Sequence, residues 1–207
     1  MQNQIRQIAT AFERLALFWR SNQWSVAKEY GLNPSQGDVL QRISRQPERA
    51  ADLAQRLGVT QASLSDTISA LVAKGLAERR PDPEDGRARR IEATGQGRAL
   101  AAVMPDVPEP LDAAIARLGD ADRGALLRTL SLIIRSLQEA EAIPIQQMCL
   151  TCRHFRPHVH DDPARPHHCG FVDAAFGNGG LRLDCADHET ATEEEAARNR
   201  ARLAAVG

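Results

Sequence analysis

Residues 50–74 have the sequence AADLAQRLGVTQASLSDTISALVAK, which contains two short helical patterns separated by a glycine. In the first pattern two leucines lie four residues apart, and Gly58 follows as a terminator. In the second, Thr60 is placed to cap a helix whose apolar residues cover one side only. A helix, a short glycine-containing turn and a helix with a small polar outer face together predict a helix-turn-helix.

A β-hairpin is predicted directly after the second helix. Residues 76–80 and 89–93 form two short strand patterns around the turn-forming sequence PDPEDGR at 81–87. The hairpin carries a cluster of arginines, and Arg87 lies at its tip, where its side chain can extend toward a phosphate backbone. Such a cluster alone is more typical of a solvated surface, but the preceding helix pair favours nucleic-acid binding.

The candidate DNA-contacting residues fall on the second helix and on the hairpin. Short polar side chains let a helix enter the major groove, while arginines of a wing reach the adjacent backbone or minor groove. The candidates are Gln61, Ser63, Asp66, Thr67, Ser69, Arg79, Arg87, Arg89 and Arg90.

Two long amphipathic helices are predicted on either side of this region. Apolar residues recur at spacings of three and four over residues 3–30, and a strongly apolar helix is expected over 120–142. Shorter helices are expected after Asn33-Pro34, from Thr94, and near residue 110. The fold is therefore expected to be mainly α-helical with a small β-hairpin wing. The apolar surface of the two long helices favours an oligomer interface over packing within one chain.

This order of motifs resembles the MarR family of winged helix-turn-helix transcriptional regulators. The resemblance rests on residues 50–60, on LVAKGLAER at 71–79, and on PEDGR and TGQG within 83–97, where Asp85 and Arg87 match the family's Asp-x-Arg wing. It covers about residues 1–142 and implies a homodimer, joined through its first and last helices, that binds a pseudo-palindromic double-stranded DNA operator. A repressor is expected. The family's small phenolic effector site is not carried over because no residue marks it, so any small-molecule effector stays unknown.

All four cysteines and all six histidines lie within residues 149–188. The cysteine spacing is Cys149-x2-Cys152-x16-Cys169-x15-Cys185, and in a cytoplasmic protein such a set favours metal binding over disulfides. Four thiolates complete a tetrahedral Zn²⁺ site that is closed to water and therefore structural. The same four ligands suit an iron–sulfur cluster, and free thiols or a redox pair are a third alternative.

The predicted metal-binding module spans residues 143–189 and precedes a polar helix or tail at 190–207. Residues 143–188 show no sustained period and are rich in Pro, Gly, His and Asp, so a bound metal is expected to order them. His168 or His188 could replace one cysteine as a ligand. A zinc site favours a structural role, whereas a cluster favours a regulator that senses metal or redox state.

Composition, charge and the absence of certain motifs restrict the functional classes to which this protein can belong. The 207 residues carry a net charge of −1, with 15 basic against 11 acidic residues over 1–100 and 11 against 16 over 101–207. This charge permits DNA binding without requiring it. No apolar run approaches the roughly 20 residues of a membrane span, and no secretory signal is evident, so a cytoplasmic protein is expected. No HExxH motif, glycine-rich phosphate loop or CxxC in a βαβ setting occurs, and no enzyme activity is expected.

Overall fold

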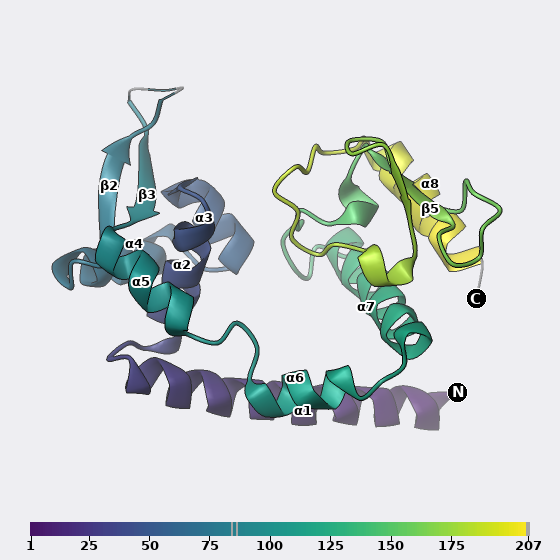
Figure 1. Ribbon diagram of the computed structural model, residues 1–207, viewed down its shortest axis with the longest axis horizontal. Helices are drawn as coiled ribbons and strands as arrows, with labels where there is room; N and C mark the ends of the chain where they lie inside the picture. Colours follow the sequence, from purple (N-terminus) through teal and green to yellow (C-terminus); the bar gives the residue numbers. More distant parts are fainter. Residues whose placement is uncertain (84, 86, 206–207) are drawn as a thin grey trace. The chain divides into compact units, whose positions relative to one another are not determined.

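The structure is a computed structural model that describes residues 1–83, 85 and 87–205. It divides into two compact units, the first ending at Asp112 and the second beginning at Ala113 (Figure 1). Each unit has a buried apolar core of its own. The expected fold class, mainly α-helical with a small antiparallel hairpin, is confirmed. Among the described residues, no helix has both the length and the apolarity that a membrane span requires.

The first unit contains the helices that the periodicity predicts. They are α1 (Gln2–Glu29), α2 (Pro34–Arg45), α3 (Ala50–Leu57), α4 (Gln61–Ala73) and α5 (Gly95–Val103).

Local capping explains where these helices begin. Asn33 Oδ1 accepts the backbone N–H of Gln36 at 2.9 Å, and Gln36 Oε1 accepts that of Asn33, which forms a capping box at the start of α2. The side chains of Thr60 and Thr94 cap α4 and α5 in the same way, each accepting a backbone N–H three residues ahead. These contacts lie within a single turn and follow directly from the sequence.

A three-stranded antiparallel sheet completes the winged helix. Its strands are β1 (Glu48–Arg49), β2 (Ala77–Pro81) and β3 (Arg89–Ala93), in the order β1-β3-β2. Strands β2 and β3 form the predicted hairpin, while the two-residue strand β1 is an addition that no sequence pattern indicates. Two residues of the predicted turn, Glu84 and Gly86, lie outside the described residues.

The core of the first unit holds the helix-turn-helix against the sheet. Its fully buried members share an apolar side chain and come from α2, α3, α4 and β3: Val39, Leu40, Leu53, Leu64, Ile68, Leu71, Ile91 and Ala93. Because both α3 and α4 place one face in this core, their relative position is set by packing rather than by the turn alone.

The second unit contains two helices and a small sheet. Helix α6 (Glu109–Ala116) includes the boundary between the units, and α7 (Asp120–Glu139) and α8 (Glu193–Ala205) belong to the second. Between α7 and α8 lie the antiparallel strands β4 (Phe155–Arg156), β5 (His167–Cys169) and β6 (Ala174–Phe176), in that order across the sheet. Two 3-10 helices, η1 (Cys149–Thr151) and η2 (Asn178–Gly180), flank this sheet.

Helix α7 packs with the cysteine-containing segment, against η2 and α8. The buried side chain of Arg135 illustrates this packing, since it forms ion pairs with Glu139 of its own helix and with Glu193 of α8. The boundary between the two compact units falls at Asp112. The sequence prediction instead placed α7 in the winged-helix domain, which was expected to extend to residue 142. The periodicity of the sequence predicts α7 correctly, but it does not predict that η2 and α8 pack against this helix.

Candidate nucleic-acid interface and cysteine cavity

The turn between α3 and α4 presents the outer face of α4 to solvent. Gly58 ends α3 with a φ of 64°, in the left-handed region that glycine adopts without strain. Leu64, Ile68 and Leu71 anchor the inner face of α4 in the core. The predicted contact residues on the opposite face are exposed, with Thr67 half-buried: Gln61, Ser63, Asp66, Thr67 and Ser69.

Two of these polar groups already have partners in the structure. Thr67 Oγ1 donates to the carbonyl oxygen of Ser63 at 3.0 Å, which ties it to its own helix. Ser69 Oγ accepts a hydrogen bond at 3.1 Å from Nη2 of Arg79 on β2. The second bond connects the candidate recognition helix directly to the wing, so the two candidate DNA-binding elements share one polar surface.

The arginines of the hairpin differ in how much they are engaged. Arg79, Arg87 and Arg89 are exposed. Arg90 is half-buried, and its Nε donates to Oδ2 of Asp82 at 2.9 Å. Arg80 forms ion pairs with Glu78, at 2.8 Å, and with Glu92. The guanidinium of Arg80 correspondingly lowers the pKa of the Glu78 carboxyl, chiefly by hydrogen bonding.

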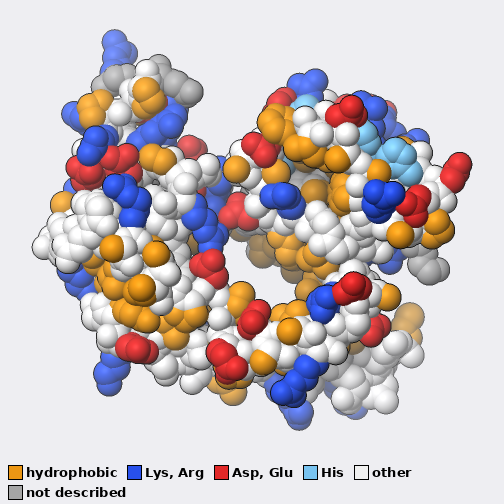
Figure 2. All heavy atoms as spheres, viewed as in Figure 1, with side chains coloured by type: hydrophobic (Ala, Val, Ile, Leu, Met, Phe, Trp, Pro, Cys, Tyr) orange, Lys and Arg blue, Asp and Glu red, His pale blue; other side chains and the backbone are white. Residues whose placement is uncertain are grey.

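The turn of the wing is organised by Asp82, which directly follows β2 and was not among the predicted site residues. Its carboxylate is buried and also accepts from Nε of Arg49, on β1, at 2.6 Å. Asp82 Oδ1 accepts the backbone N–H of Asp85 at 3.3 Å, and Asp85 Oδ1 accepts that of Arg87 at 3.0 Å. The two aspartates thus hold the backbone at Arg87 in place. Figure 2 shows Lys and Arg side chains gathered over this hairpin.

Comparison with known proteins identifies this arrangement. Residues 30–88 match the family model described as "MarR family". The matched residues include α2, α3, α4 and β2, so this part of the chain is similar to the MarR family. A search of curated proteins found no match.

Solved structures share the fold of this MarR-type region. A MarR transcriptional regulator from Methanosarcina mazei is 20% identical with a TM-score of 0.56, over 65% of this chain and 99% of that one. MepR from S. aureus, in complex with DNA, is 18% identical with a TM-score of 0.55, over 63% and 97%. The regulator BldR from Sulfolobus solfataricus is 24% identical with a TM-score of 0.51, over 64% and 97%. About a third of this chain is therefore additional to each of these structures.

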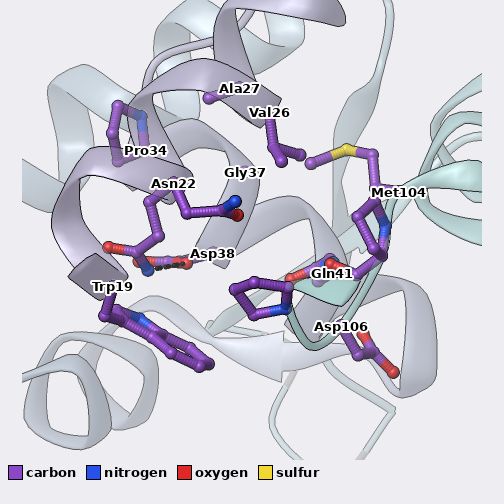
Figure 3. Close-up of a pocket in the computed structure, with 13 residues that line it drawn as sticks. Trp19, Asn22, Val26, Ala27, Pro34, Gly37, Asp38, Gln41, Met104 and Asp106 are labelled. Carbon is purple, nitrogen blue, oxygen red and sulfur yellow. Dashed lines mark hydrogen bonds between the residues drawn. The ribbon is translucent and has the colours of Figure 1, made fainter. Parts of the chain in front are cut away.

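A small cavity lies within the MarR-type unit between α1, α2 and the segment after α5 (Figure 3). Trp19, Asp38 and Met104 are among its lining residues, and Gln23 Nε2 donates to Asp38 Oδ1 at 3.3 Å. Burial raises the pKa of the Asp38 carboxyl. The cavity volume of about 60 Å³ is well below the roughly 300–1,000 Å³ of ligand pockets. This cavity therefore does not identify an effector.

A larger cavity, of about 240 Å³, lies in the second unit, outside the residues that match the MarR family. All four cysteines line it: Cys149 from η1, Cys152 just after η1, Cys169 from the end of β5, and Cys185 from the loop before α8. Burial raises the pKa of the Cys149 thiol to about 11, and the other three cysteines act in the same direction. The four cysteines therefore line one cavity, and their binding of a common ligand stays a prediction.

The rest of this cavity is mainly apolar and aromatic. Its apolar lining residues are Phe155, Phe171, Val172, Ala174 and Phe176, and Arg182 and Asp187 are charged. The backbone N–H of Arg182 donates to Sγ of Cys149 at 3.3 Å. Among residues 1–83, 85 and 87–205, no three cysteine, histidine or acidic side chains are already arranged around a single ion position.

The histidines considered as alternative ligands lie elsewhere. His188 Nε2 forms a hydrogen bond with Oγ1 of Thr151 at 3.0 Å, and His168 Nε2 lies 3.2 Å from Oδ1 of Asp173. Neither residue is part of the cavity wall. His154 does line the cavity, but its Nε2 is directed to Oε1 of Glu189, 3.0 Å away.

Proposed function

We propose that this protein is a sequence-specific DNA-binding transcriptional regulator that acts as a repressor. The observation that carries the proposal is the outer face of α4, which presents short polar side chains beside an arginine-bearing hairpin. Ser69 and Arg79 join these two elements by a hydrogen bond of 3.1 Å. The regulator binds DNA and has no catalytic role.

The chemistry of each element suits a different part of a DNA duplex. Gln61, Ser63 and Asp66 are exposed on α4, and short side chains allow a helix to approach base edges in the major groove. Arg87 and Arg89 are exposed on the hairpin and suit phosphate or minor-groove contacts, which position the protein without selecting a sequence. Arg90, held by Asp82, serves mainly to orient the wing.

A homodimer is the second part of the proposal. Large apolar side chains are exposed along α1, including Leu15 at 54% and Leu17 at 63% of their surface, and α7 exposes Leu126 at 44%. A second copy of the chain would cover such faces in an isologous interface. Two recognition helices related by a two-fold axis require an operator with inverted half-sites about one helical turn, roughly 34–36 Å, apart.

Selection of bound duplexes from a random library tests this function. We expect the full-length protein to enrich an inverted repeat whose half-site centres are about 10–10.5 base pairs apart, or a multiple of that spacing. Footprinting on the enriched sequence should then protect both half-sites. Enrichment of a single unrepeated site would remove the dimer from the proposal. No enrichment and no binding at low salt would overturn DNA recognition altogether.

A further inference from the structure

We propose that the cavity of the second unit binds an iron–sulfur cluster through the thiolates of Cys149, Cys152, Cys169 and Cys185. Both an iron–sulfur cluster and a single zinc ion are compatible with the cysteine spacing, and it is the geometry of the folded segment that favours the cluster. The inference does not depend on DNA binding.

Backbone hydrogen bonds fix the segments that carry the four cysteines. The N–H of Cys149 donates to the carbonyl of Arg182 at 2.9 Å, and the N–H of Cys185 donates to that of Gln147 at 2.8 Å. Cys169 pairs with Phe155 across β4 and β5, close in sequence to Cys152. Backbone hydrogen bonds of the loops and of the β4–β5 strand pair therefore hold the cysteine-bearing segments around one cavity.

The size of the cavity that the four cysteines line is the main argument. Four thiolates on one zinc ion each lie about 2.3 Å from it, so such a site is filled by the ion itself. Here the cysteines border a cavity of about 240 Å³. A cluster of several irons and bridging sulfides, bound by four cysteine thiolates, occupies more volume than a single ion.

The wall of the cavity suits the same occupant. The aromatic side chains of Phe155, Phe171 and Phe176 line the cavity beside the cysteines, and such apolar surroundings tune the potential of a cluster. The N–H of Arg182 donates to Sγ of Cys149, and hydrogen bonds to ligand sulfurs are a regular feature of cluster sites. Arg182 also lines the cavity and adds a basic residue beside the four cysteines, whose thiols would be deprotonated on binding the cluster.

The ligand set consists of cysteines alone. His168 and His188 are outside the cavity wall and have polar partners of their own. His154 borders the cavity with its Nε2 directed to Glu189. The assignment therefore makes a distinction that can be measured: each cysteine is required for the cluster, and the histidine next to Cys169 is not.

The decisive experiment is metal and sulfide analysis of the full-length chain purified without oxygen. We expect two or four irons per chain, an equal number of acid-labile sulfides, and a matching mass increase in native mass spectrometry. Visible absorption should fade when dithionite is added. One zinc per chain without sulfide, or a chain with no metal at all, would overturn the proposal.

Matched variants test the ligands. Cys169→Ser should lose at least nine-tenths of the iron and sulfide per chain, whereas His168→Asn, one residue away, should retain them. Full iron and sulfide in Cys169→Ser would contradict its assignment as a ligand. If this variant does not fold, the wild-type analysis still decides the identity of the group. Arg87→Ala, in the wing, should keep the full cluster, so failure of the DNA-binding proposal and failure of this one are separable.

Discussion

Asp82 Oδ2 accepts a hydrogen bond from Nε of Arg90 at 2.9 Å, within the hairpin that forms the wing. The same oxygen accepts from Nε of Arg49 at 2.6 Å, so one buried carboxylate joins β1 to the start of β3, next to the turn. The Asp82 side chain has no exposed surface, while those of Arg49 and Arg90 keep 38% and 30% of theirs. The orientation of the wing is thus set by an ionic contact below the exposed surface of the hairpin.

Replacing Asp82 tests this role. Asp82→Asn keeps the shape but removes the charge, and we expect a loss of about 1–3 kcal/mol in the free energy of unfolding. Urea denaturation followed by circular dichroism measures the change. Asp85→Asn is the matched control, since Asp85 is exposed, and it should change stability by less than about 0.5 kcal/mol. Equal stability of the two variants would contradict a structural role for the buried carboxylate.

Arg87 is expected to contact the DNA backbone. Arg87→Ala should weaken binding by a similar factor on specific and unrelated duplexes, and should reduce the salt slope of log K by about one. Fluorescence anisotropy at several salt concentrations measures both quantities. Arg165→Ala, an exposed arginine of the second unit, removes the same charge and should leave the slope unchanged. An unaltered slope in Arg87→Ala would remove this residue from the interface.

Gly97 is required where α5 approaches the loop before β2. A Cβ at this position would overlap the carbonyl oxygen of Leu76 and lie 3.2 Å from Cδ1 of Leu40. Gly97→Ala should therefore lower the free energy of unfolding by about 1–3 kcal/mol through overpacking. Gly95→Ala, at the start of the same helix, meets no atom within 4 Å and should be neutral or slightly stabilising. Thermal unfolding of the pair checks this, and similar Tm values for both would show that α5 can shift at no cost.

The exposed apolar face of α1 is expected to form the dimer interface. Ile8→Glu combined with Leu15→Glu places two charges on residues that are 48% and 54% exposed, and should shift the protein from dimer to monomer. Sedimentation velocity measures the mass. Val103→Glu, an exposed apolar position on α5, makes the same chemical change away from α1 and should leave the dimer intact. A wild-type monomer at micromolar concentration would rule out the interface without any variant.

The helices and their starts could be predicted from the sequence by itself, because their causes are local. An apolar residue every three or four positions specifies a buried helical face, as in α1, α4 and α7. Asn33, Thr60 and Thr94 cap backbone groups within three residues of themselves, so their role depends on no distant partner. Clustering of the cysteines in one segment likewise indicates a shared ligand before any fold is known.

Contacts between groups that are far apart along the chain depend on the complete fold. Asp82 reaches Arg49 over 33 residues, and no pattern in either neighbourhood signals that pair. Strands β4, β5 and β6 are two or three residues long, too short for an alternating pattern to mark them. His168 and Cys169 are neighbours on β5, yet only Cys169 lines the cavity. Contacts between distant residues are selected by packing and by satisfaction of buried polar groups, and neither has a sequence period.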